Sequence, residues 1–212
     1  MTWQTQVAIV NSLQVVTMLI GIIRIKHLDN ASKTLLVYIV LSTSSELLAT
    51  YTAIHYHNNL VVLNIFSLIE YLVTCLYFQK SIPAFRLTKV ISILLIGIAV
   101  WIFTTLSHPI HKQLNTPFLV FESTTIIGLC HYYFYDLLNA DDNRIITPSF
   151  GFVSFLFIFW SFTFTYWLFG LTLRTGMQEQ GVWLGRLIWI INLVCYSGFS
   201  LVFLFYKKLQ NR

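Results

Sequence analysis

The hydrophobic residues of this chain fall into seven long runs, and short polar segments separate them. Each run has about 20 residues, the length that an α-helix needs to cross the hydrocarbon layer of a membrane. The predicted spans are 7–25, 34–56, 60–79, 90–106, 116–138, 148–171 and 182–206. The pattern therefore predicts an all-α integral membrane protein, a bundle of seven transmembrane helices that forms one domain over residues 1–212.

Composition leads to the same class of protein. The chain is 57% hydrophobic and only 10% charged, whereas a soluble domain is about 25% charged. Its three cysteines, Cys75, Cys130 and Cys195, all lie inside hydrophobic runs, so we expect buried thiols rather than a disulfide framework. No basic segment precedes the first run, and we expect the first helix to be its own insertion signal.

Lysine and arginine predict the orientation in the membrane, because cytoplasmic loops carry an excess of them. Three basic residues lie on one side of the predicted bundle: Lys112, Arg174 and Arg186. Ten lie on the other: Arg24, Lys26, Lys33, Lys80, Arg86, Lys89, Arg144, Lys207, Lys208 and Arg212. This bias places the N-terminus outside and the C-terminus in the cytoplasm. Since the net charge of +5 is spread over helix ends, it predicts no nucleic-acid partner.

Two glutamates lie deep in neighbouring runs that share the short turn 57–59. Glu46 and Glu70 are each about 12 residues from that turn, which is about 18 Å along a helix. Both carboxyls should therefore lie at one depth near the middle of the membrane, where acidic groups are costly and are functional by default. Serine, threonine and alanine flank each glutamate at helical spacing, which predicts interior faces. Like charges held close together cannot both ionise, so one carboxyl would keep its proton. Each glutamate could instead be a structural group bonded to a serine or tyrosine.

Five further residues complete the predicted site for a ligand or a proton. Glu122 and Arg186 are the opposite charges in the outer third of their helices, and an ion pair between them would offset the cost of burying each. Arg186 could instead extend its side chain to the membrane surface. Asn192 lies near the middle of the last run, and Asn64 and Tyr71 lie on the run that carries Glu70.

Histidines near the outer ends of the helices form the one metal site that the sequence offers. The four imidazoles that could bind zinc or copper there are those of His55, His57, His108 and His111. Histidine is also ordinary at a membrane surface. No GxSxG, HExxH or glycine-rich phosphate loop is present. The sequence therefore assigns no catalytic residue and identifies no cofactor.

Three stretches carry a resemblance. They are Asn64-Ile65-Phe66-Ser67-Leu68-Ile69-Glu70-Tyr71, Ile188-Trp189-Ile190-Ile191-Asn192 and the aromatic run over 150–169. They resemble segments of uncharacterised bacterial seven-helix membrane proteins, which are similar in topology to the input modules of bacterial sensor kinases. The resemblance implies a place in the bacterial inner membrane and a sensory role. Because such modules normally precede an output domain and this sequence ends at Arg212, we expect a separate cytoplasmic or membrane-anchored signalling partner.

Three functions remain open from the sequence. The first is a sensor or receptor-like module, in which a small ligand or proton acts on the interior acidic site and changes helix packing. The second is a membrane enzyme acting on a lipid or isoprenoid, with Glu46 or Glu70 as general acid or base. The third is a small-solute transporter built from the first three and the last three helices around an apolar fourth. Transporters often bind at helices broken by proline, and no proline interrupts a span here.

Overall fold

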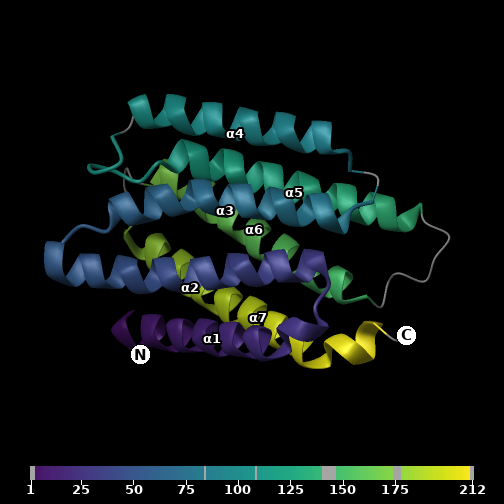
Figure 1. Ribbon diagram of the computed structural model, residues 1–212. Helices are drawn as coiled ribbons and strands as arrows, with labels where there is room; N and C mark the ends of the chain where they lie inside the picture. Colours follow the sequence, from purple (N-terminus) through teal and green to yellow (C-terminus); the bar gives the residue numbers. More distant parts are fainter. Residues whose placement is uncertain (1–2, 84, 108, 140–146, 174–177, 211–212) are drawn as a thin grey trace. The chain divides into compact units, whose positions relative to one another are not determined.

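The computed structural model describes residues 3–83, 85–107, 109–139, 147–173 and 178–210 (Figure 1), and these residues are all helical apart from short turns. Seven α-helices follow one another, as the hydrophobic pattern predicted. A short 3₁₀-helix, η1 (Ile25–His27), follows the first of them. The α-helices are α1 (Trp3–Arg24), α2 (Asn30–Tyr56), α3 (Leu60–Ser81), α4 (Leu87–Ser107), α5 (Thr116–Leu138), α6 (Pro148–Leu173) and α7 (Gln178–Gln210).

Six of the helical segments are long and apolar enough to cross a membrane. They are Thr5–His27, Asn30–Tyr56, Leu60–Ser81, Leu87–Ser107, Pro148–Phe169 and Gly185–Gln210. The prediction of seven spans is thus supported at six. Helix α5 has 23 residues and is long enough, but Glu122, His131 and the polar run 123–125 make it less apolar. That α5 crosses the membrane stays a prediction.

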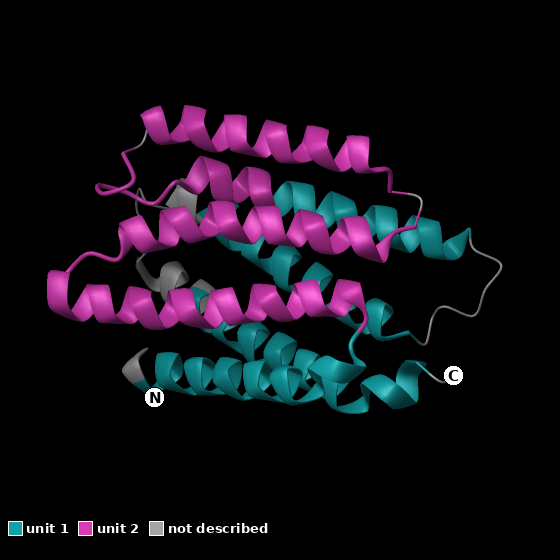
Figure 2. Cartoon of the chain, in the orientation of Figure 1, with its two compact units in different colours: residues 1–28, 123–212 teal, residues 29–122 magenta. Residues whose placement is uncertain are grey.

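The chain divides into two compact units, coloured separately in Figure 2. Unit 2 comprises residues 29–122, which hold α2, α3, α4 and the start of α5. Unit 1 comprises residues 1–28 and 123–212, which hold α1, η1, α6, α7 and the rest of α5. That residues 1–212 form one domain stays a prediction.

Unit 2 is organised by the hairpin of α2 and α3. Helix α2 begins after Asp29, whose carboxylate accepts a hydrogen bond from the Ser32 backbone N–H at 2.7 Å, the usual role of an N-cap aspartate. The helix ends at His57, which takes a left-handed backbone conformation with φ 53° and so reverses the chain. At the far end, Lys80 Nζ donates to Thr34 Oγ1 at 2.8 Å. The predicted antiparallel hairpin is confirmed.

Unit 1 has a core in which α7 packs against both α1 and α6. Thr17 on α1 hydrogen-bonds through its hydroxyl to Ser200 Oγ at 2.8 Å and to the Tyr196 carbonyl at 3.1 Å, both on α7. On the other side of α7, the Phe152 and Phe203 ring centroids lie 4.9 Å apart. Buried hydroxyls that reach across helices in this way satisfy their hydrogen bonds without water.

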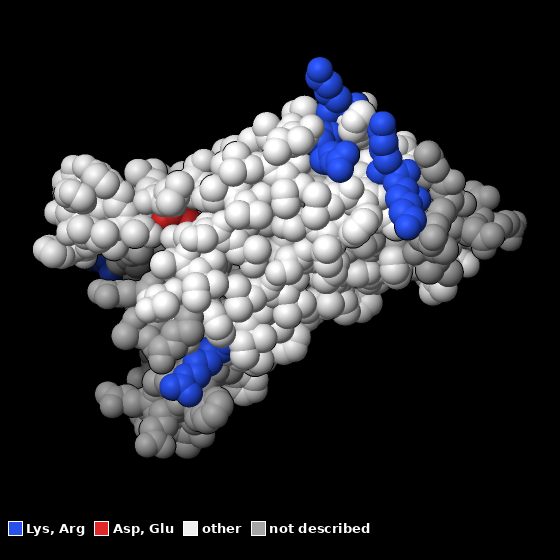
Figure 3. All heavy atoms as spheres, turned by 90° about the horizontal axis from the view of Figure 1, so that it is seen from below, with Lys and Arg blue, Asp and Glu red and all other residues white. Residues whose placement is uncertain are grey.

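Lysine and arginine gather at helix ends. They lie in the last turns of α1, α3 and α7, where their positive charges interact favourably with the negative end of the helix dipole. Figure 3 shows wide white areas without charged side chains on the face that it presents, with several blue groups and one small red group. An uncharged surface of this kind suits contact with lipid, and charges at helix ends suit the membrane surface.

Candidate functional site

Three acidic side chains on three helices of unit 2 lie within electrostatic reach of one another through Glu70. Glu46 lies on α2, Glu70 on α3 and Glu122 on α5, and both Glu46 and Glu122 interact electrostatically with Glu70. Tyr38 on α2 donates its hydroxyl proton to Glu70 Oε1 at 2.5 Å. We call Glu46, Glu70 and Glu122 the acidic cluster.

Glu122 is the most deeply placed member of the acidic cluster. Its side chain is 0% exposed, and neither carboxyl oxygen has a hydrogen-bond partner among the described residues of its unit. Glu46 and Glu70 are half-buried. A buried polar group without a partner is uncommon in folded proteins and calls for an explanation, such as a proton or a ligand that the group binds.

The polar faces that flank the glutamates lie in the interior, as their spacing predicted. Ser42 and Ser45 on α2 and Ser67 and Thr74 on α3 are all buried. Ser67 donates to the Asn64 carbonyl at 2.9 Å. Ser45 Oγ and Thr74 Oγ1, in contrast, find no hydrogen-bond partner within the described part of the chain. Two hydroxyls on the glutamate-bearing faces therefore have capacity for a further partner.

The lysines on α2, α3 and α4 lie only near the helix ends, at Lys33, Lys80 and Lys89. The sequence has no lysine or arginine between residues 34 and 79 or between residues 90 and 111. Lys80, near the end of α3, donates a hydrogen bond to Thr34. Several carboxyls cannot all ionise side by side without a compensating cation, so this arrangement can take up protons or a positively charged ligand.

Tyr38 is the site residue that the sequence reading did not include. It precedes Ser42 by one helical turn and Glu46 by two, so it lies on the same face of α2. Extending the polar face of α2 by one turn would have found it. The hydrogen bond from the Tyr38 hydroxyl to Glu70 joins α2 to α3.

Asn64, predicted as a ligand-binding residue, is fully engaged in the fold. Its side-chain amide donates to the backbone carbonyls of Ile110 and Gln113, both at 2.9 Å. Its side-chain oxygen accepts from the Asn115 backbone N–H at 2.7 Å, and its own carbonyl accepts from Trp101 Nε1 at 3.0 Å. These bonds hold the loop between α4 and α5 on α3 and favour a structural role.

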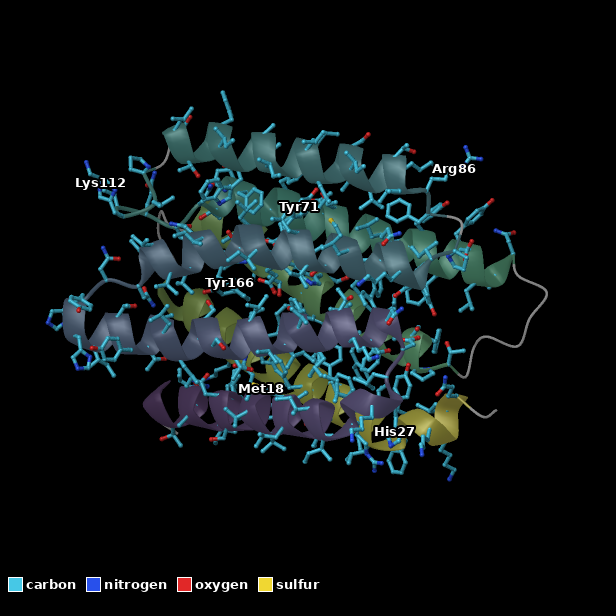
Figure 4. All side chains as sticks on the ribbon, in the orientation of Figure 1. Met18, His27, Tyr71, Arg86, Lys112 and Tyr166 are labelled. Carbon is cyan, nitrogen blue, oxygen red and sulfur yellow. The ribbon has the colours of Figure 1, made fainter. Side chains whose placement is uncertain are left out.

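Tyr71 likewise joins helices of unit 2 (Figure 4). The side chain is 0% exposed, and its hydroxyl donates to the Ile93 carbonyl on α4 at 2.7 Å. Its ring lies so close to Gly97 on α4 that a Cβ there would overlap it. Phe118 and Phe121 on α5 pack against the same ring, with centroids 5.9 Å away in each case. Tyr71 therefore joins α3 to both α4 and α5.

The remaining predicted site residues, Arg186 and Asn192, belong to unit 1. Asn192 donates from its amide to the Ile188 carbonyl of its own helix at 2.9 Å, and Arg186 is exposed. Because Glu122 is assigned to unit 2, its predicted ion pair with Arg186 stays a prediction.

The histidine site also stays unconfirmed. His55 and His57 are exposed at the end of α2, and the His55 ring stacks on Tyr51 with centroids 4.2 Å apart. His111 is exposed, and His108 lies outside the described residues. Among the described residues, no group of three histidine, cysteine, aspartate or glutamate side chains could hold a metal ion. The three cysteines are buried free thiols, as predicted.

Comparison of the chain with protein-family models, with curated proteins and with solved structures finds no match. The resemblance to bacterial seven-helix proteins therefore stays a prediction, and the site rests on its own chemistry.

Proposed function

We propose that this chain is an integral membrane sensor or receptor-like module of the bacterial inner membrane. In this proposal the acidic cluster takes up a proton or a small ligand, and the resulting change in helix packing is passed to a separate signalling partner. The observation that carries the proposal is Glu122: a fully buried carboxyl that has no hydrogen-bond partner among the described residues of its unit and that interacts electrostatically with Glu70. Intramembrane acids of this kind are functional by default.

The contacts of the cluster provide a way to convert binding into movement. Glu70 is held to α2 by Tyr38, so a change in charge at Glu70 changes a bond between two helices. Glu122 is the last residue of unit 2, and α5 continues from it into unit 1. A change in the charge of Glu122 therefore acts on α5, a helix whose two parts belong to different units. Binding that favours one of two helix arrangements would shift the population toward it.

The proposed orientation places the basic helix ends in the cytoplasm. Lys80 ends α3, and Lys207 and Lys208 end α7. We propose that a cytoplasmic or membrane-anchored partner binds at this basic face, with Arg144, outside the described residues, as a further contact. Crosslinking from cysteines placed at these ends in native membranes should capture a discrete protein.

One observation favours the enzyme as a second candidate. Glu46 is half-buried, and the residues that follow it, Leu47 and Leu48, are each 51% exposed, so a lipid substrate could approach this acid from the membrane. The transporter receives less support, since α1 belongs with α5, α6 and α7 rather than with α2 and α3. This grouping differs from the predicted halves of three helices each.

Infrared difference spectroscopy of the reconstituted full chain between about pH 5 and pH 8 tests the acidic cluster. A protonated carboxyl should give a carbonyl band that changes with pH, and Glu122→Gln or Glu70→Gln should remove or shift it. Asp136→Asn, an acid lost from the far end of α5, is the matched control and should leave the band in place. A spectrum that neither glutamine variant alters would contradict the proposal. Turnover of a lipid by the purified chain would support the enzyme instead.

A further inference from the structure

Most of the lysines and arginines of unit 2 gather at one of its ends. Four of them lie near the start of α2, in the last turn of α3 and at the start of α4: Lys33, Lys80, Arg86 and Lys89. All four side chains are exposed, and we call these residues the basic end. The opposite end of the unit carries Lys112. In Figure 4, Arg86 and Lys112 lie at opposite ends of this unit.

Hydrogen bonds and a short turn bring the members of the basic end together. Lys80 Nζ donates to Thr34 Oγ1 at 2.8 Å, which places the start of α2 beside the end of α3. The chain then reaches α4 through a turn in which the Phe85 N–H donates to the Ile82 carbonyl at 3.0 Å. Both of these side chains are buried, and Arg86 follows directly. The positive charges of three helices therefore lie at one end of the unit.

Few acidic side chains accompany these positive charges within unit 2. The sequence has no aspartate or glutamate between Glu70 and Glu122, so the whole of α4 and the turns beside it lack acids. The exposed acid near the start of α2 is Asp29, whose carboxylate accepts from the Ser32 N–H and caps that helix. The basic end therefore has an excess of positive charge, which attracts anions.

Exposed apolar residues continue from the cations along the same helices. Among the six candidate spans α4 is the most apolar, and Leu87, Ile91 and Leu95 form an exposed stripe on it at intervals of four residues. On α2, Val37 is exposed one turn after Lys33. A phospholipid has the same order, because its charged phosphate is followed by hydrocarbon chains. A soluble protein would match only the cations.

We infer that the basic end binds anionic phospholipids, with their phosphates on Arg86 and Lys89 and their acyl chains along the exposed stripe of α4. Guanidinium and ammonium groups donate charge-assisted hydrogen bonds to phosphate oxygens. Each cation near a membrane surface strengthens its attraction to anionic lipid by about fivefold. The basic end shares no residue with the acidic cluster, so lipid binding there does not depend on the proposed function.

Fluorescence quenching in vesicles tests lipid binding at the two ends of α4. A fluorophore is attached to Thr88→Cys at the basic end or, as the matched reporter, to Ser107→Cys at the last residue of the same helix. Both positions are exposed, whereas the three native thiols are buried. The full chain is reconstituted in mixed phosphatidylglycerol, which is anionic, and phosphatidylcholine, which has no net charge. The two lipids have the same acyl chains, and each in turn carries the nitroxide quencher.

Quenching should show the anionic lipid enriched over the neutral lipid by at least about fivefold at Thr88, and close to equal amounts at Ser107. Arg86→Gln should lower the enrichment at Thr88 about fivefold. Lys112→Gln removes the same charge at the opposite end and should leave that enrichment unchanged. Raising the salt from about 0.1 M to about 1 M shortens the screening length from about 10 Å to about 3 Å and should reduce the enrichment in the chain with its native charges.

Two results in vesicles would overturn the inference: equal enrichment at Thr88 and Ser107, or an enrichment at Thr88 that Arg86→Gln leaves unchanged. A third result concerns native membranes. Crosslinking of one discrete protein from Thr88→Cys there, without lipid enrichment in vesicles, would assign the basic end to the signalling partner instead of lipid.

Discussion

Replacing Asn64 should destabilise unit 2 more than any loss of a single surface bond, because one side chain serves three backbone groups. Asn64→Ala removes the partners of the Ile110 and Gln113 carbonyls and of the Asn115 N–H. Asn115 is fully buried, whereas Ile110 and Gln113 are half-buried and can recover bonds from water. An orphaned buried donor costs about 1–3 kcal/mol and each of the other two bonds about 0.5–1.5 kcal/mol, so the sum is about 2–6 kcal/mol.

Asn58 offers a matched control for this prediction. It is an exposed asparagine whose amide donates to the His111 carbonyl of the same loop at 3.0 Å. Its side-chain oxygen also accepts from the Leu60 N–H at 2.9 Å. Asn58→Ala should cost at most about 1–3 kcal/mol for the two bonds, and less where water replaces them at this exposed site. A third variant, Asn64→Asp, keeps the acceptor for the Asn115 N–H and loses both donors. Its free energy of unfolding should lie below that of Asn58→Ala, and repulsion between the carboxylate and the two carbonyls should lower it further.

Thermal and denaturant unfolding of the full chain in one detergent would measure these differences. Limited proteolysis should in addition show cleavage in the loop between α4 and α5 in Asn64→Ala before the rest of the chain unfolds. If Asn64→Ala costs no more than Asn58→Ala, the loop is not held by Asn64. The residue would then return to the list of possible ligand-binding groups.

Two further predictions address packing and topology. Gly97→Ala should destabilise the chain by about 1–3 kcal/mol, because its Cβ would overlap the Tyr71 ring. Gly128→Ala on α5 is the control, because a Cβ there would meet nothing within 4 Å. This substitution should stabilise the helix by about 0.5–1 kcal/mol. Equal effects of the two substitutions in unfolding experiments would argue against the close approach of α3 and α4. A cysteine at Asn58 should react with an impermeant reagent outside intact cells and a cysteine at Arg86 should not, and the reverse pattern would invert the proposed orientation.

Local sequence pattern determined the helices and the hairpin. The seven hydrophobic runs correspond to α1 through α7, and the polar turn 57–59 follows α2 where His57 reverses the chain. The buried faces of α2 and α3 could also be predicted, because serine and threonine recur beside Glu46 and Glu70 at helical spacing. Such features depend on residues within a few turns of one another, which is the range over which sequence pattern is informative.

The partners of the polar side chains depended on the tertiary structure. The sequence placed Asn64 and Tyr71 in the candidate site, and only the structure shows that their side chains bond to backbone groups of a distant loop and of α4. Backbone carbonyls are the same at every residue, so no sequence pattern marks which of them a side chain will meet.

The sequence likewise did not mark which acids would belong to the acidic cluster. The distances of Glu46 and Glu70 from a shared turn predicted that the two lie at one depth. Glu122, in contrast, lies on α5, beyond another helix and its loops. Its approach to Glu70 follows from the packing of unit 2, and only the folded chain shows it. The sequence by itself determined the helices and the presence of acids within them. The tertiary structure decided which of those acids meet, because that depends on contacts between helices that are far apart along the chain.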